Sequence, residues 1–397
     1  MRKLPPGGSL AVILGFGLAA CAGIEGAYAE SERNHPYRDS LTRLSRSTFN
    51  AEVAETLRSA IPAYPENWYS NRADKAGDND HTGRTPDNAL SPEPGDMPEE
   101  LHLYLHHYGI ASAADKWHLG TVAVSDTTAP DGFQVALQSI LPAEPDPESP
   151  VVLLIHGYFD HTATNRYAIE ELLDRGYRVV AMDMPGHGLS SGKRGRIEDF
   201  GDYGRAVHAA VDAIRNGNIP GIASDSQLAA IGHSTGASAV IEYLETGGDS
   251  FGRLIFVAPL VRIVAYPLAR VGIELTSDLV DHVPRLTSGA STNEAFIEFS
   301  SEYDPLSIDE TSLKWADAYI DWEESRRTIA ERQLPLLLVQ AGRDSTVDTE
   351  YNSEYLKRFF PNTELIEYED ARHNVFNEPV ELRPGLYDRI HRFLSGR

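Results

Sequence analysis

The sequence predicts an α/β protein with a mostly parallel, doubly wound sheet covered by helices on both faces. The short continuous apolar run at 151–155 has the composition of a strand that is buried on both faces of a parallel sheet, and 177–182 is expected to be the next buried strand. Segments of helical pattern, such as 168–175 and 200–215, alternate with these runs. This alternation implies right-handed crossovers between parallel strands and therefore a doubly wound sheet.

The individual elements follow in order from about residue 117. Two antiparallel strands at 121–124 and 133–139 flank a turn whose residues are Ala, Pro, Asp and Gly. Further strands are expected at 151–155, 177–182, 228–231, 254–257 and 336–340. The helices between them are expected at 168–175, 200–215 and 237–244, and a last helix follows near the C-terminus.

Charge is the unusual feature of the composition. The 397 residues include 35 Lys and Arg against 59 Asp and Glu, a formal net charge of −24. A surface of this sign repels nucleic acid phosphates and anionic lipids, so neither is expected as an electrostatic partner.

The N-terminus has the form of an export signal. Arg2 and Lys3 precede a short apolar core at 10–18, and small residues lead to Cys21, the chain's one cysteine. This arrangement resembles the lipobox of bacterial lipoproteins, in which the signal is removed before the cysteine and the cysteine is acylated. The competing interpretation is an ordinary secretory signal that is cut after Ala29. Because Ala22 follows the cysteine rather than Asp, the lipoprotein interpretation implies the periplasmic or outer face of a bacterial envelope, with a lean toward the outer membrane.

The sequence divides into three regions. Residues 1–20 are the expected signal peptide, and 21–115 are an expected N-terminal extension and linker, whose polar stretch up to Glu99 could tether the rest to a membrane. Residues 116–397 form the expected catalytic domain, in which an insert at about 262–333 contains apolar and aromatic residues among many acids. We expect this insert to form a helical cap before the strand at 336–340.

Ser234 is the candidate nucleophile. It lies at the centre of Gly232-His233-Ser234-Thr235-Gly236, between an expected strand and an expected helix. A serine on such a tight turn projects its hydroxyl above the sheet edge, and the small flanking residues permit the turn.

An acid and a base follow the serine in the required order. A serine hydroxyl needs a neighbouring base to take its proton, and His373 lies in a loop near the C-terminus. Asp344 follows the strand at 336–340, at the sheet edge where α/β active sites form. Asp348 is the alternative acid.

The oxyanion of the reaction intermediate requires preorganised N–H donors. The amide of Thr235, directly after the nucleophile, is one candidate, and the amide of Tyr158 in the loop after the strand at 151–155 is the other. His156 and His161 in that loop could be mistaken for bases, but we expect them to hold the loop by hydrogen bonding.

These segments together resemble the monoacylglycerol lipase and lysophospholipase group of α/β-hydrolases, also called serine aminopeptidase-like hydrolases. The resemblance rests on the His156-Gly157 loop, the stretch 183–190, the serine turn, and the Asp344 and His373 segments, and it runs from about residue 117 to the C-terminus. It implies an α/β-hydrolase fold with the triad Ser234, Asp344 and His373. The chain departs from the group at Thr235 and at 158–160, which concerns the acyl pocket rather than the triad.

Three functions remain open from the sequence. The first is a serine esterase that acts on monoacylglycerol or lysophospholipid through an acyl-enzyme. The second is a hydrolase of another acyl compound, such as a lactone, thioester, amide or peptide. The third is a non-catalytic surface lipoprotein that binds a ligand. No cofactor or metal is expected, because triad chemistry is self-contained.

Overall fold

The structure is a computed structural model that describes residues 49–64, 68–70, 98–110, 116–277, 279–285, 289–325 and 330–396. The expected signal at 1–20 and the expected lipidation site, Cys21, lie outside the described residues. All strands and helices below belong to the described part of the chain.

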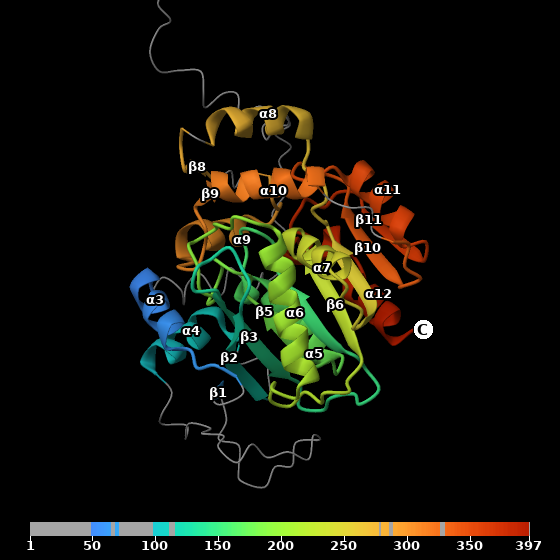
Figure 1. Ribbon diagram of the computed structural model, residues 1–397. Helices are drawn as coiled ribbons and strands as arrows, with labels where there is room; N and C mark the ends of the chain where they lie inside the picture. The colour runs from blue at the N-terminus through green and yellow to red at the C-terminus, as the bar shows by residue number, and fades with distance from the viewer. Residues whose placement is uncertain are drawn as a thin grey trace, which may run out of the picture.

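One large mixed sheet forms the centre of the molecule (Figure 1). Its strands are β1 (Tyr69–Ser70), β2 (Lys116–Val124), β3 (Phe133–Leu141), β4 (Val151–Ile155), β5 (Val179–Met182), β6 (Leu228–His233), β7 (Phe251–Val257), β10 (Leu336–Ala341) and β11 (Thr363–Tyr368). Their order in the sheet is β1-β2-β3-β5-β4-β6-β7-β10-β11. The pairs β1–β2, β2–β3 and β3–β5 are antiparallel, and all later pairs are parallel. The predicted fold class is therefore confirmed.

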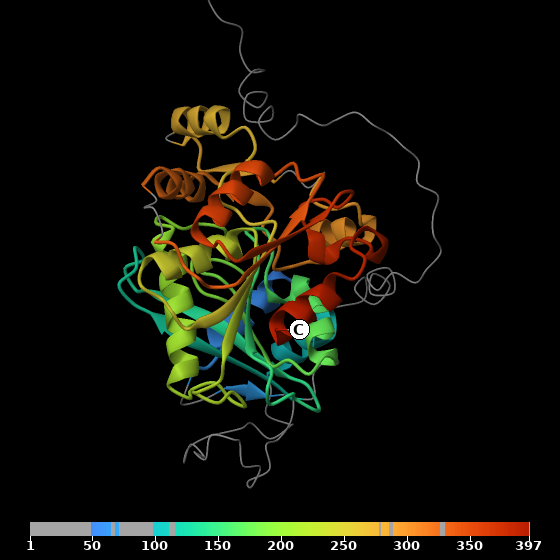
Figure 2. The ribbon, with the colours of Figure 1, turned by 90° about the vertical axis from the view of Figure 1, so that its right-hand side faces the viewer.

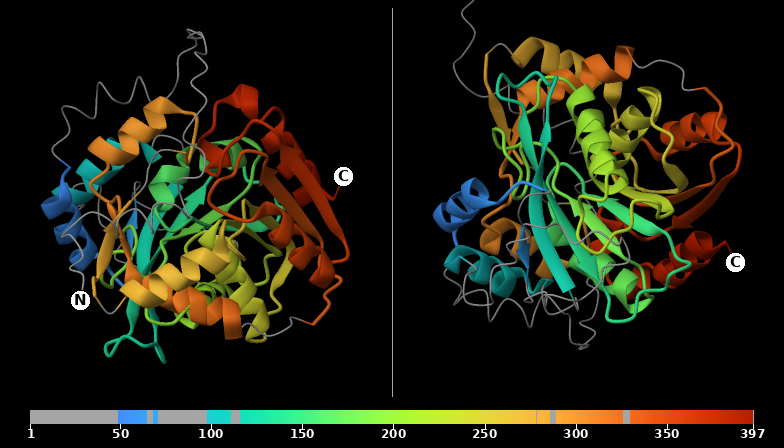
Figure 3. Two further views of the ribbon diagram at one scale, coloured as in Figure 1. Left: turned by 90° about the horizontal axis from the view of Figure 1, so that it is seen from above. Right: turned by 60° about the horizontal axis from the view of Figure 1, so that its bottom comes forward.

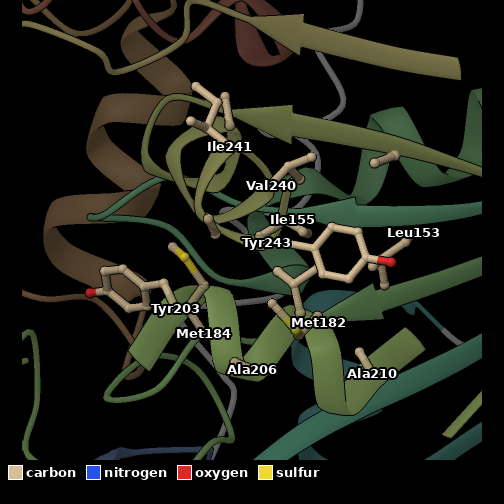
Figure 4. Close-up of a cluster of buried hydrophobic side chains, with 14 of the residues drawn as sticks. Leu153, Ile155, Met182, Met184, Tyr203, Ala206, Ala210, Val240, Ile241 and Tyr243 are labelled. Atoms are coloured by element: carbon tan, nitrogen blue, oxygen red, sulfur yellow. The ribbon is translucent and has the colours of Figure 1, made fainter. Parts of the chain in front are cut away.

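The apolar runs are continuous because both faces of the central strands are buried. In β4, Leu153 and Ile155 belong to one hydrophobic cluster, whereas Val152 and Leu154 belong to the cluster on the other face. Figure 4 shows the first cluster, in which Leu153 and Ile155 lie near side chains of α6 and α7. These apolar runs specify strands with helices on both sides.

Helices cover the two faces of this sheet. They are α3 (Ala51–Ala60), α4 (Glu99–Tyr108), α5 (Arg166–Asp174), α6 (Gly201–Arg215), α7 (Thr235–Glu245), α11 (Thr349–Phe359) and α12 (Leu386–Ser395). Short 3-10 turns are η2 (Thr162–Asn165), η4 (Val375–Asn377) and η5 (Val380–Leu382). Residues of α6, α7 and α11 belong to one cluster, and residues of α3, α4, α5 and α12 belong to the other.

Parts of the expected N-terminal extension belong to the folded core. Helices α3 and α4 lie beside each other at one side of the molecule (Figure 3). Phe49, Leu57, Leu101 and Tyr104 are each at most 3% exposed and join the same cluster as α5 and α12. Residues 49–61 and 98–110 are therefore structural components of the core. The polar stretch up to Glu99 that was expected to act as a tether lies almost entirely outside the described residues.

The insert between β7 and β10 forms the expected cap, although it is not entirely helical. It contains α8 (Tyr266–Thr276), β8 (His282–Pro284), α9 (Glu294–Glu298), η3 (Phe299–Tyr303), β9 (Glu310–Ser312) and α10 (Leu313–Ser325). Strands β8 and β9 pair as a small antiparallel sheet. In two perpendicular views, α8 lies outside α10 at the end of the molecule (Figures 1 and 2). Among the described residues, no helix is long and apolar enough to span a bilayer.

Candidate active site

Ser234 occupies a strained turn between β6 and α7. Its backbone dihedrals are φ 50° and ψ −115°, a conformation that residues other than glycine rarely adopt. A Cβ atom on Gly236 would lie 2.3 Å from the carbonyl oxygen of Ile155, and one on Gly232 would lie 2.6 Å from the nitrogen of Ala237. Both flanking glycines are therefore required by close backbone contacts, as the motif predicted.

Three side chains from separate loops meet at this turn. The His373 Nε2 atom lies 2.9 Å from Ser234 Oγ, and His373 Nδ1 lies 2.7 Å from Asp344 Oδ2. Ser234 follows β6, Asp344 follows β10 and His373 follows β11, so parallel strands bring all three to the same edge of the sheet. The hydrogen-bond partners define the tautomer: Nδ1–H donates to the carboxylate, and Nε2 accepts from the serine hydroxyl.

Asp344 is fixed independently of the histidine. Its side chain is fully buried, and its Oδ1 atom accepts hydrogen bonds from the amides of Thr346 and Val347 at 2.8 and 3.0 Å. Asp348 has a different role, because its Oδ1 atom accepts from the amide of Tyr351 at the first turn of α11. The structure thus places Asp344 on His373 and makes Asp348 a helix cap.

Burial and Asp344 act in opposite directions on the pKa of His373. Burial alone would lower the pKa of His373, but the Asp344 charge and hydrogen bond outweigh burial and raise that pKa above 6.5. This arrangement stabilises the imidazolium that forms when the histidine takes a proton from the serine.

The two predicted oxyanion amides lie in neighbouring loops. Thr235 is the first residue of α7, so its amide has no acceptor within the helix. The Tyr158 amide has no backbone acceptor among the described residues. A Cβ on Gly236 would also come within 2.7 Å of the His156 carbonyl oxygen, which shows that the serine turn and the loop after β4 are in direct backbone contact.

His156 and His161 have the structural role that the sequence predicted. His156 Nδ1 lies 2.7 Å from the Gly157 carbonyl oxygen, and its Nε2 accepts from the Met184 amide at 2.9 Å. His161 Nε2 lies 3.0 Å from Asp304 Oδ2 in the cap. The two rings connect the loop after β4 to the loop after β5 and to the cap.

Two further polar residues, Asp160 and His233, support the site, and sequence reasoning did not single them out. His233 Nε2 lies 3.1 Å from the backbone oxygen of His373, and its Nδ1 lies 3.3 Å from Asp160 Oδ2. Burial alone would raise the pKa of Asp160, but the contact with His233 and the nearby charge of Arg285 lower it to about 2. The only local signal for them is adjacency, because His233 precedes the nucleophile and Asp160 lies in the oxyanion loop.

The cap also contacts the histidine loop. The Asn374 amide donates to the Ala290 oxygen at 2.8 Å, and Glu378 accepts from both the Thr292 amide and the Arg372 amide. Among the described residues, no group of three or more His, Cys, Asp or Glu side chains could hold a metal ion.

Comparison with known proteins gives the family. The serine aminopeptidase, S33 family matches residues 146–380, which is more than half of the chain and contains every candidate site residue placed above. The chain belongs to this family. It is a lipase- or esterase-like serine hydrolase of the monoacylglycerol lipase and lysophospholipase group, at low sequence identity to its relatives.

Two relatives illustrate the similarity. Phospholipase YtpA of Bacillus subtilis is 27% identical over 239 residues, which are 58% of this chain and 89% of the relative. The monoglyceride lipase homolog of Monkeypox virus is 25% identical over 253 residues, which are 62% of this chain and 90% of the relative.

Solved structures show the same fold. The monoacylglycerol lipase of Paleococcus ferrophilus superposes with a TM-score of 0.55 at 23% identity, covering 66% of this chain and 98% of that protein. A soluble variant of monoglyceride lipase from Saccharomyces cerevisiae gives 0.56 at 18% identity, covering 70% and 96%.

Proposed function

We propose that this chain hydrolyses carboxylic esters of monoacylglycerol or lysophospholipid, with Ser234 as nucleophile, His373 as base and Asp344 as the acid that orients the base. The observation that carries this proposal is the continuous hydrogen-bonded chain from Asp344 through His373 to Ser234. It ends on a serine held in a strained turn.

The chemistry follows from these contacts. As Ser234 Oγ bonds to the ester carbonyl carbon, its proton passes to His373 Nε2, and the oxyanion is stabilised by the amides of Tyr158 and Thr235. The ester C–O bond then breaks, and the alcohol departs with the proton from Nε2. A water molecule repeats the sequence on the acyl-enzyme, releasing the carboxylic acid and restoring the serine.

Two features support a lipid substrate. The names of the relatives include a phospholipase and a monoglyceride lipase homolog. The cap also carries exposed apolar side chains: Leu268, Val271 and Leu275 lie at helical spacing on α8, and Leu279 and Val280 follow just after it. Such an apolar surface suits contact with a lipid aggregate better than contact with water.

The test is a hydrolysis screen with a matched inactive variant. We expect the wild-type protein to release fatty acid from monoacylglycerol or lysophospholipid, and to hydrolyse p-nitrophenyl esters from acetate to palmitate. Ser234→Ala should lose several orders of magnitude in rate and should no longer react with a fluorophosphonate probe. A folded Ser234→Ala protein that keeps a tenth of the rate would refute the assignment. A labelled wild type that cleaves only amides or thioesters would refute the ester class, and one that cleaves only lactones would refute the monoacylglycerol or lysophospholipid substrate.

We also propose that the mature protein begins at Cys21 and is held by acyl chains at the periplasmic or outer face of a bacterial envelope. Two or more chains anchor a protein stably, because each buried methylene contributes about 0.8 kcal/mol. Fractionation and mass spectrometry of wild type and Cys21→Ser test this directly. A wild-type protein that is soluble, or that begins at Glu30 without lipid, would refute the anchor and leave the hydrolase proposal unaffected.

A further inference from the structure

The side chain of Tyr158 reaches from the oxyanion loop to the cap. Its hydroxyl donates to the Gly195 carbonyl oxygen at 2.5 Å and accepts from the Ser312 amide of β9 at 3.1 Å. Only 6% of the residue is exposed, and burial raises the pKa of its phenol, so the hydroxyl stays protonated and able to donate. The Tyr158 hydroxyl therefore connects the loop after β5 to β9, the strand that directly precedes α10.

The aromatic ring is held from the cap as well. The ring centroids of Tyr158 and Trp315 are 4.1 Å apart, with an angle of 34° between the ring planes, and Trp315 lies in the first turn of α10. Trp315 is in turn stacked on Tyr319. A tyrosine side chain has few rotatable bonds, so a ring fixed by stacking and two hydrogen bonds also restricts its own backbone.

The backbone of the same residue has little freedom on its other side. A Cβ on the preceding Gly157 would lie 2.9 Å from His233 Nδ1, and the Asp160 amide donates to the Gly157 oxygen at 3.1 Å in a tight turn. The position of the Tyr158 amide is therefore restricted both by the closely packed turn that contains Gly157 and by the residue's own side chain, which contacts the cap.

We propose that the Tyr158 side chain is a positioning residue that couples the cap to the oxyanion hole. This inference rests on the proposed function, since it concerns the amide that receives the oxyanion. When β9 and α10 are in place, Ser312 and Trp315 fix the phenol ring, and the ring fixes the direction of the Tyr158 amide. A cap that moves away releases the ring and lets the amide turn from the reacting oxygen.

Tyr158→Phe tests the coupling, because it removes both hydroxyl contacts but keeps the ring and the backbone amide. We expect kcat for a soluble p-nitrophenyl ester to fall about ten- to a hundred-fold with little change in KM, since a displacement of about 1 Å can cost a hundred-fold. The Ki of a trifluoromethyl ketone transition-state analogue should rise by the same factor. Tyr177→Phe is the matched control: it is also buried and its hydroxyl is also paired, with His391 on the other face, and it should change neither value.

Trp315→Leu addresses the same coupling from the cap and leaves Tyr158 intact. We expect it to lower kcat and to weaken binding of the ketone in the same proportion. In the double variant the two losses should combine to less than their product, because both act through one ring. Wild-type kcat and Ki in Tyr158→Phe, or losses that multiply in the double variant, would overturn the inference. A wild type that hydrolyses no ester would instead refute the proposed function.

Discussion

Replacing Asp344 by Asn should remove most of the activity through the tautomer of His373. The Oδ1 atom of Asp344 holds the amides of Thr346 and Val347, and Asn can keep both bonds only if its carbonyl oxygen occupies that position. Its NH2 group then faces His373 Nδ1, which must accept rather than donate. The remaining imidazole proton moves to Nε2, where it faces Ser234 and prevents the ring from taking the serine proton.

The expected loss is large. A wrong tautomer in a triad of this kind lowers kcat by about 10⁴, which corresponds to about 5.4 kcal/mol in the activation free energy. Asp348→Asn should keep the rate within about two-fold, because Asn is as good a helix N-cap as Asp. Asp348→Ala should instead cost about 1 kcal/mol in the free energy of unfolding, with kcat retained.

The assay measures kcat on a soluble p-nitrophenyl ester and the free energy of unfolding in urea for all three variants. The reasoning is refuted if Asp344→Asn is folded and keeps more than a tenth of the rate. It is equally refuted if Asp348→Asn loses more activity than Asp344→Asn.

Four other outcomes are expected. The rate should rise with pH as His373 loses its proton, with a midpoint above pH 6.5, because the charge and hydrogen bond of Asp344 together outweigh burial and raise the pKa of His373. The Asp344–His373 pair should contribute its full stability below pH 6.5, and this contribution should fall as the pH rises through the folded-state pKa of His373. A rate that rises with a midpoint below pH 6.5 would contradict the pairing. Gly236→Ala should destabilise the fold by at least about 2 kcal/mol in urea, since its Cβ would strike backbone of the β4 loop, whereas Gly252→Ala has room and should be tolerated. Leu275→Ser, at a side chain that is 69% exposed, should slow hydrolysis of lipid aggregates but not of a soluble ester, and an equal loss on both would argue against contact with lipid. EDTA should leave the rate unchanged, and restoration by zinc or calcium after a loss would show that a metal is needed.

The sequence predicted those parts of the fold that depend on local patterns. The runs at β4 and β5 are apolar at every position, and the run at β10 is apolar at every position but Gln340, because neighbours cover both faces. Each strand could therefore be recognised alone. Ser234 was recognisable because the turn itself requires Gly232 and Gly236. Asp344 could be favoured over Asp348 because it directly follows the turn after the strand, but Asp348 stayed an alternative, because the sequence does not show which carboxylate points back to the sheet edge and which caps α11.

Contacts between segments that are distant in the sequence leave no comparable local pattern from which they could be predicted. The link of Tyr158 to Ser312 joins residues 154 positions apart, and the hydrogen bond from Tyr108 to Asp304 joins residues 196 positions apart. Residues 49–61 and 98–110 were assigned to an extension because the family resemblance begins only at about residue 117. Their burial depends on a surface that other segments supply. The strands β8 and β9 are three residues each, which is too short for alternation to be visible.

Because α3 and α4 are packed into the core, the part of the chain that must fold together is longer than the part that the family model matches. The family matches residues 146–380, yet β2 and β3 lie before that region and cover the edge of β5. A chain cut at residue 146 would leave β5 as an open edge, a template for pairing with other chains. It would also uncover the surface beneath Leu57, Leu101 and Tyr104 and remove the Tyr108 donor from buried Asp304. The catalytic machinery can thus be inherited in one piece while its solubility depends on residues well outside that piece.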